Sequence, residues 1–153
     1  MTDETASIRA ASANDVDAVM AVFIASRHDA MAYLPVLYTP AEIRFWIGEI
    51  MLKQHEVFVA AQGDDITGFV AMTPSTVDHL YILPNEQGRG LGSTLLRIAK
   101  ERAAQGLRLN VFQRNDRARE FYEWHGFQLV ELRDGSQNEE REPDAVYAWR
   151  RET

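Results

Sequence analysis

The chain has 153 residues, of which 46% are hydrophobic and 25% charged. This length and apolar fraction predict a single domain over residues 1–153, with a core of its own. Acidic residues outnumber basic ones by 23 to 16, for a formal charge of −7. That balance argues against general nucleic-acid binding, which relies on Lys and Arg. Cysteine is absent, which excludes disulfides, thiolate metal sites and a cysteine nucleophile.

The spacing of the histidines argues against a metal site, and the short apolar runs argue against a membrane span. The histidines are far apart in the sequence and form no metal-binding pair: His28, His55, His79 and His125. The first residues, Met1–Ser7, are acidic and polar, unlike a signal peptide. The longest apolar run, Ala18–Ala25, is too short to cross a bilayer. We therefore expect a cytoplasmic protein without metal, nucleic-acid or membrane binding. The sequence is compatible with a homodimer.

The first part of the chain predicts a strand at Ser7–Ala10 followed by two helices. Ser12 and Asp15 form an N-cap signal ahead of apolar residues with helical spacing. The second helix is expected to begin after Thr39, which together with Glu42 has the pattern of a capping box.

Strands and helices then follow in an order typical of an α/β protein. The expected strands are Glu56–Ala60, Ile66–Met72, Val77–Leu83, Leu107–Phe112, Phe127–Leu132 and Ala145–Trp149. One helix is expected after the glycine-rich turn that ends at Gly92, and another over Asn115–His125. Hairpin pairing early in the chain and a crossover later predict an α/β (α+β) fold, with one central mixed β-sheet flanked by helices on both faces.

The most informative segment is the loop Gln87–Ser93, which reads Gln-Gly-Arg-Gly-Leu-Gly-Ser and joins a strand to a helix. Its glycines allow positive φ and close backbone approach, and the start of a helix presents free N–H groups. This arrangement suits a phosphate or pyrophosphate. The spacing differs from the dinucleotide fingerprint G-x-G-x-x-G, and the sequence has no Gly-Lys pair for a P-loop. The glycines alone are also compatible with a tight strand-to-helix turn that binds no ligand.

Two sequence blocks together carry a resemblance to a known family. The loop fits the pattern Q/R-x-x-G-x-G/A, and residues 115–127 read N-x-x-A-x-x-F-Y-x-x-x-G-F. With these blocks, the chain resembles the GNAT superfamily, whose members move an acetyl group from acetyl-CoA to an amine. The resemblance covers nearly the whole chain, and it implies the GNAT acyl-CoA N-acyltransferase fold with acetyl-CoA as the acetyl donor.

The resemblance implies a role for each residue that matches the family's motifs. The strand residues Leu80, Tyr81 and Ile82 would pair their backbone with the pantetheine arm of CoA, as an added strand does. Asn115 would hydrogen-bond the pantetheine, and Tyr122 would lie beside the sulfur and protonate the departing thiolate. The pyrophosphate would be held by the loop residues Gln87, Gly88, Arg89, Gly90, Leu91, Gly92 and Ser93.

Some of these residues also have plain structural interpretations. Tyr122 fits a core aromatic residue, and Asn115 fits the N-cap of its helix. Arg89 fits a solvated side chain in a loop where only the backbone matters. We expect Asn115 to serve both as a cap and as a cofactor ligand.

The general base is harder to predict. An alkylammonium with a pKa of about 10 must lose a proton before its nitrogen can attack. Some family members carry a Glu at the position of Asn110, which cannot accept that proton. The remaining candidates are Asp78 and His79, and the alternation of side chains along a strand predicts that only one of them faces the cleft. A strand-edge carboxylate and a half-buried structural histidine are the other interpretations.

Two further segments are candidates for acceptor binding. One is the acidic loop 138–144, although a charged loop is often simply solvated. The other is the segment after the first helix, where His28, Tyr33 and Tyr38 would line the acceptor site or pack between helices.

The sequence thus predicts an acetyl-CoA-dependent N-acetyltransferase. A primary amine, on a small molecule or a peptide, would attack acetyl-CoA directly, because no cysteine is present to form an acyl-enzyme. One alternative is an acyltransferase that uses a longer acyl-CoA or acts on a different nucleophile. The other is a module of the same fold that binds acyl-CoA as a sensor without turnover.

Overall fold

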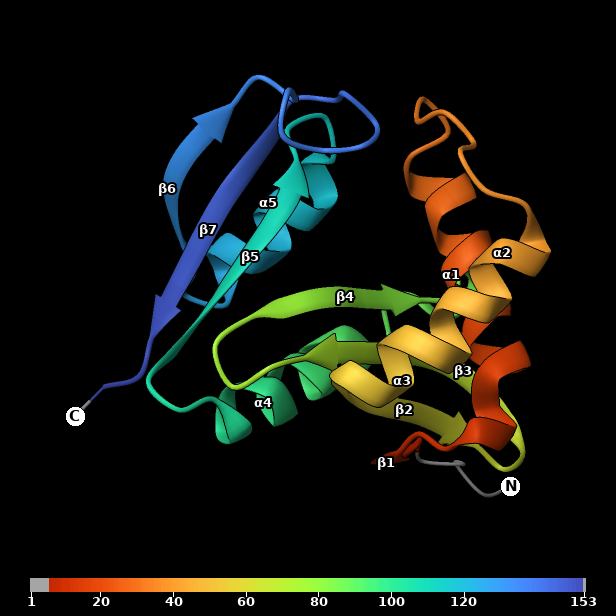
Figure 1. Ribbon diagram of the computed structural model, residues 1–153. Helices are drawn as coiled ribbons and strands as arrows, with labels where there is room; N and C mark the ends of the chain where they lie inside the picture. Colours follow the sequence, from red (N-terminus) through yellow and green to blue (C-terminus); the bar gives the residue numbers. More distant parts are fainter. Residues whose placement is uncertain (1–5, 153) are drawn as a thin grey trace.

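A computed structural model describes residues 6–152 as two antiparallel β-sheets with helices on both sides (Figure 1). The first sheet has the order β1 (Ser7–Ala10), β2 (Glu56–Gln62), β3 (Asp65–Met72) and β4 (Val77–Ile82). The second sheet has the order β5 (Gly106–Phe112), β7 (Asp144–Arg150) and β6 (Gln128–Arg133). An isolated parallel bridge between Thr76 and Arg108 links the two sheets.

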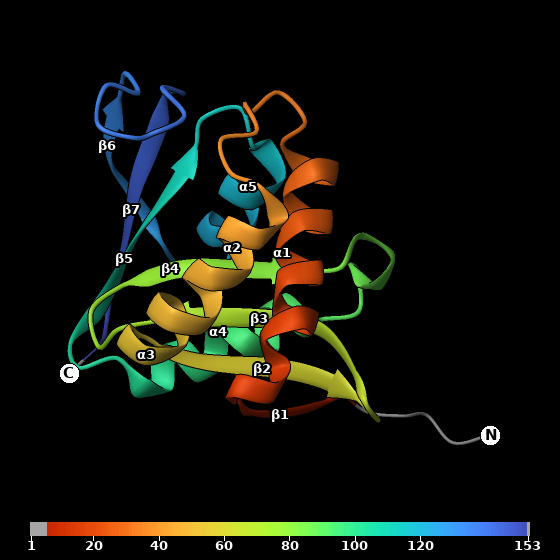
Figure 2. The ribbon, with the colours of Figure 1, turned by 45° about the vertical axis from the view of Figure 1, so that its right-hand side comes forward.

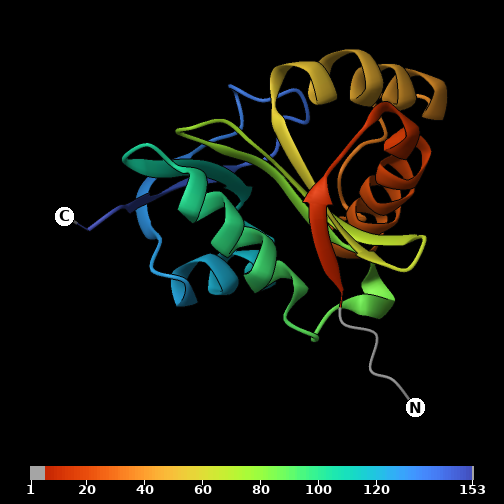
Figure 3. The same cartoon turned by 90° about the horizontal axis from the view of Figure 1, so that it is seen from below.

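The helices fall into two groups on opposite faces of the sheets (Figure 3). One face is covered by α1 (Val16–Ala30), α2 (Pro40–Trp46) and α3 (Leu52–Gln54), and the other by α4 (Leu91–Arg102) and α5 (Asp116–Trp124). Strand β3 is buried at every position after its first residue, because α1 packs on one of its faces and α4 on the other. Among residues 6–152, no helix is long and apolar enough to cross a membrane.

Both predicted helix starts are present. The N–H of Ser12 donates to the Asp15 carboxylate at 2.8 Å, in a short 3₁₀ turn that precedes α1. At α2, the Thr39 hydroxyl accepts from the Glu42 N–H at 3.2 Å, and the Glu42 carboxylate accepts from the Thr39 N–H at 2.9 Å. A π-helical turn at Ile47–Met51 follows α2 and was not predicted.

The predicted fold class is confirmed, with one difference in the sheet. The ends of the observed strands β2 to β7 differ from the predicted ends by at most two residues, and several coincide. The single mixed sheet that was expected is instead divided between β4 and β5, and its parallel part is reduced to the bridge at Thr76.

A β-bulge in β4 explains this division. Met72 of β3 pairs with Val77 and Ala71 pairs with His79, so Asp78 is an extra residue in β4. A bulge bends its strand and increases the local twist. Beyond the bridge, β4 turns away from β5, and the two strands open into a split (Figures 1 and 2).

Candidate functional site

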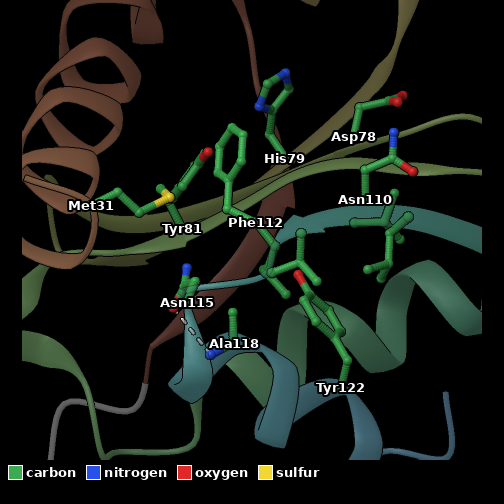
Figure 4. A pocket seen from close by; sticks show the side chains of 13 residues that line it. Met31, Asp78, His79, Tyr81, Asn110, Phe112, Asn115, Ala118 and Tyr122 are labelled. Carbon is green, nitrogen blue, oxygen red and sulfur yellow. Dashed lines mark hydrogen bonds between the residues drawn. The ribbon is translucent and has the colours of Figure 1, made fainter. Parts of the chain in front are cut away.

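The split between β4 and β5 is a cleft with walls from both sheets, from α5 and from the chain after α1 (Figure 4). Its lining includes the three predicted catalytic residues, Asp78, His79 and Tyr122, together with Asn115. Asn110 of β5 lies next to Asp78 at one end of the cleft. The tertiary structure therefore gathers residues that the sequence spreads over about a third of the chain.

The backbone of β4 has a free edge toward this cleft. The Leu83 N–H donates to the Thr67 carbonyl at 2.8 Å. Backbone groups point to alternate sides of an antiparallel strand, so those of Leu80 and Ile82 point away from β3 and toward β5. The Ile82 carbonyl accepts hydrogen bonds from the Ser26 hydroxyl at 2.9 Å and the Gln87 amide at 3.2 Å. This edge provides backbone partners for an extended ligand.

The glycine-rich loop that follows β4 has the geometry of an anion cradle. Gly88 and Gly90 have φ of +84° and +81°, and a Cβ built on either meets no atom within 4 Å. A side chain would therefore fill open space where a phosphate can approach the backbone. The N–H groups in the first turn of α4 lack helical partners, and its positive dipole end favours an anion.

The other loop residues have distinct structural roles. Arg89 is exposed, and its side chain pairs with Glu86 at 3.2 Å, so the backbone rather than the guanidinium shapes the loop. Gly92 lies close to α5, because a Cβ there would be only 3.3 Å from the Phe121 ring. The Ser93 hydroxyl hydrogen-bonds His125 Nε2 at 2.9 Å and ties the start of α4 to the end of α5. This role of His125 had no signal in the sequence.

Asn115 and Tyr122 hold different positions on α5. The Asn115 side chain accepts from the Ala118 N–H at 3.3 Å, which confirms the predicted N-cap. The Tyr122 ring packs against the Phe121 and Phe127 rings, with centroids 5.2 and 5.6 Å away, and it also lines the cleft. Burial raises the pKa of the Tyr122 hydroxyl, which keeps its proton at neutral pH. It is thus a packed aromatic residue with a proton available to the cleft.

The sequence predicts that only one of Asp78 and His79 faces the acceptor cleft, and of the two only His79 lines the second cavity described below. The bulge at Asp78 interrupts the alternation of side chains, and both residues line the cleft. The Asp78 carboxylate already has two partners, the Thr76 hydroxyl and His55 Nε2, each at 2.9 Å. His55 was missed because it lies ahead of β2, with no local pattern that links it to β4.

His79 lies in an aromatic enclosure. Its ring centroid is 5.1 Å from Trp46, 5.9 Å from Phe23 and 6.1 Å from Tyr81. Burial among these rings lowers the pKa of His79 to about 4, so the imidazole is neutral at pH 7. Within residues 6–152, its buried Nδ1 has no hydrogen-bond partner. His79 is thus a neutral imidazole whose ring lies beside the cleft.

A second cavity, which we call the acceptor groove, adjoins the cleft. It has a volume of about 770 Å³ and lies between α1, the segment 31–38, α2 and residues 139–140. His79 lines both the groove and the cleft. Of the residues predicted here, His28 and Tyr38 line the groove, whereas Tyr33 packs under the Arg114 guanidinium at 3.9 Å.

The acidic loop packs against the helical side of the molecule. Glu139 accepts a hydrogen bond from the Tyr38 hydroxyl at 2.6 Å, and Glu140 forms an ion pair with Arg27 at 3.0 Å. Glu142 pairs with Arg114 at 2.7 Å. Two of these carboxylates, Glu139 and Glu140, line the acceptor groove. Within residues 6–152, no group of three potential metal ligands comes together.

The family model described as "Acetyltransferase (GNAT) domain" matches residues 53–129. This chain belongs to the GNAT acetyltransferase family. A curated relative is the peptidyl-lysine N-acetyltransferase YjaB of Salmonella typhimurium strain LT2, which is 36% identical over 67 residues. That match covers 44% of this chain and 46% of the relative, so it spans about half the length of each.

Several solved structures share the fold over nearly the whole chain. The apo form of YjaB from Escherichia coli superposes with a TM-score of 0.78 at 24% identity, covering 94% of this chain and 97% of that one. PaiA N-acetyltransferase from Thermoplasma acidophilum, in complex with coenzyme A, has a TM-score of 0.72 at 21% identity, covering 96% and 99%. YncA from Salmonella typhimurium, with acetyl-CoA, has a TM-score of 0.72 at 17% identity, covering 97% and 95%. These likenesses establish the fold.

Proposed function

We propose that this protein transfers the acetyl group of acetyl-CoA to a primary amine by direct attack of the amine. The observation that carries the proposal is the split between β4 and β5, where the free backbone edge of β4 leads into an open anion cradle at Gly88 and Gly90. The relative named a peptidyl-lysine N-acetyltransferase and the neighbours with coenzyme A or acetyl-CoA support this choice.

The residues of the cofactor side fit the parts of acetyl-CoA in order. The backbone from Gly88 to Ser93 would hold the pyrophosphate, since it offers N–H groups and the positive end of α4. Leu80 and Ile82 would pair with the amide groups of the pantetheine arm, and Asn115 would bind the same arm beside its capping bond. Bound acetyl-CoA supplies an activated acyl thioester.

Tyr122 is the proposed acid. Its hydroxyl stays protonated at neutral pH because burial raises its pKa, and it lines the cleft. It would donate that proton to the departing thiolate sulfur. A thiol with a pKa of about 8.5 is a fair leaving group, so the acid assists departure without being indispensable.

His79 is the proposed acceptor of the amine proton, with Asp78 as the second candidate. His79 borders both the cleft and the acceptor groove, and its Nδ1 has no partner in the described part of the chain. The Asp78 carboxylate, by contrast, already accepts from Thr76 and is paired with His55. Position therefore favours His79, although burial lowers its pKa to about 4 and makes it a weaker base than an ordinary imidazole.

Release of free CoA thiol from acetyl-CoA, measured against a panel of primary amines, tests the proposal. We expect release that depends on the amine and an acetylated product of matching mass. Acetyl-CoA binding, measured in parallel by calorimetry, distinguishes an enzyme from a protein that binds acetyl-CoA without turnover. Binding without release for any amine would replace the enzyme with a sensor of the same fold.

A further inference from the structure

The acceptor groove has a charge arrangement that restricts what it can bind. Arg27 is the single Lys or Arg among the described residues that line it, and this guanidinium is already engaged. It pairs with Glu140 at 3.0 Å and stacks over the Phe23 ring at 5.2 Å. A ligand carboxylate would therefore meet no uncommitted Lys or Arg among the described residues that line the groove, and its desolvation would be poorly compensated.

The carboxylates of the groove belong to its rim and are also engaged. Glu140 pairs with Arg27, Glu139 accepts from the Tyr38 hydroxyl, and Glu42 accepts from the Thr39 N–H. Glu42 and Glu139 accept only from uncharged donors, so three carboxylates against one guanidinium leave a net negative charge that attracts an ammonium group. They do not provide the series of free carboxylates that an extended polycation needs along its length.

The remaining walls are apolar. Phe23 and Trp46 lie beside His79 at the end that adjoins the cleft. Toward solvent, Val36, Leu37 and Phe45 line the groove with exposed fractions of 92%, 43% and 64%. Exposed apolar side chains that gather in one concave site usually mark a binding surface. The volume of about 770 Å³ suits a small organic molecule.

We propose that the acceptor is a primary amine carried on a bulky apolar body, an arylalkylamine or a branched alkylamine without a carboxylate. The inference rests on the proposed function and adds the substrate class. His79 and Met31 line both cavities, so the groove and the cleft adjoin at these two side chains. The ammonium enters past the negative rim, the apolar body covers the aromatic and aliphatic wall, and the amino group reaches His79.

The reaction balances without a further reactant. The amine nitrogen forms a bond to the acetyl carbonyl carbon while the C–S bond breaks. The ammonium gives up two protons: one passes by way of His79 to solvent, and the other replaces the proton that Tyr122 donates to the thiolate. The products are the N-acetyl amide and free CoA thiol.

Initial rates with matched amines test this substrate class. The first pair is 4-phenylbutylamine and ethylamine, whose ammonium groups have similar pKa values but very different apolar surface. We expect kcat/KM at least tenfold higher for 4-phenylbutylamine. The second pair is 2-phenylethylamine and phenylalanine, which differ by a carboxylate. We expect kcat/KM to be at least tenfold lower for phenylalanine. Spermidine and Nα-acetyl-lysine amide complete the panel.

A groove variant connects this preference to the proposed wall. Phe45→Ser should lower the ratio of kcat/KM for 4-phenylbutylamine over ethylamine at least fivefold. Its exposure of 64% means that the fold does not depend on this side chain. Leu132→Ser is the matched control, because Leu132 lies on β6, is 56% exposed and is absent from the groove lining. The control should keep the wild-type ratio.

The outcomes separate this inference from the proposed function. Thiol release that is fastest with spermidine or Nα-acetyl-lysine amide overturns the substrate class and leaves the acetyltransferase intact. Equal rates for the two members of either pair, or an unchanged ratio in Phe45→Ser, do the same. No thiol release with any amine, while acetyl-CoA still binds, overturns the proposed function and the inference together.

Discussion

The proposed cofactor side and the proposed acceptor side of this site are built in different ways. On the cofactor side, the candidate groups come from one stretch of chain, residues 80–122, and most are backbone N–H and C=O groups. On the acceptor side, side chains meet from α1, α2, β4 and the loop before β7. The Arg27–Glu140 pair, for example, joins residues 113 positions apart. A site made from local backbone depends on glycines and capping residues at fixed positions in one segment. A groove made from distant side chains depends instead on how the folded elements pack together.

The largest expected effect concerns the stability of the acceptor side at low pH. The pKa of His79 is about 4 in the folded protein, against an ordinary value of 6.5. Between these two pH values, the unfolded chain binds a proton that the folded chain does not. Stability from this group is therefore complete above pH 6.5 and is lost as pH falls toward 4, by about 3 kcal/mol in all.

Unfolding by denaturant at pH 7, 5.5 and 4 measures this effect in the wild type and in His79→Gln. Glutamine does not titrate, so the variant should lose less unfolding free energy than the wild type over this range. Other acidic groups, such as Asp15 beside Arg9, titrate in both proteins and cancel in the difference. If the unfolding free energy fell by the same amount with pH in both proteins, His79 would not be an enclosed neutral imidazole.

On the cofactor side, Tyr122→Phe isolates the proposed acid. The substitution keeps the ring that packs against Phe121 and Phe127 and removes only the hydroxyl. We expect kcat to fall about 100-fold, near 2.7 kcal/mol of transition-state stabilisation, with little change in Tm or in acetyl-CoA affinity. A lower Tm with kcat intact would make Tyr122 a purely structural residue.

A comparison of His79→Gln with Asp78→Asn locates the base. We expect kcat to fall about 100-fold in His79→Gln and less than tenfold in Asp78→Asn, because only His79 borders both cavities with a free ring nitrogen. The measurement is kcat at saturating amine and acetyl-CoA, at a pH where both variants are folded. The reverse order would assign the base to Asp78, with His55 as its partner.

The smallest expected effect tests the anion cradle. Gly90→Val places a branched side chain in the open space of the loop and opposes φ of +81°. The Kd for CoA, measured by calorimetry, should rise at least tenfold, which is about 1.4 kcal/mol. Gly63→Val is the control, since Gly63 also has positive φ and open space but lies in the β2–β3 turn. Equal CoA affinity in Gly90→Val and wild type would remove the loop from the cofactor site.

The local features of this fold could be predicted because they depend on neighbours in the sequence. Capping at Thr39 and Asn115 needs residues three positions apart, and both caps are present in the structure. The same is true of positive φ at Gly88 and Gly90, which follows from glycine's lack of a Cβ. These short-range rules led to the strand order along the chain, the loop and the position of Tyr122 on its helix.

The tertiary structure determined the features that depend on contacts between residues far apart in the sequence. The bulge at Asp78 depends on how β4 pairs with β3, and it both opens the split and defeats the simple alternation of Asp78 and His79. The His55–Asp78 pair and the Arg27–Glu140 pair likewise form only after folding brings separate elements together. The sequence by itself determined most of the secondary structure and the glycine-rich loop, since both arise from local backbone preferences. Packing between distant segments determined the acceptor groove, because its shape and charge belong to no single stretch of chain.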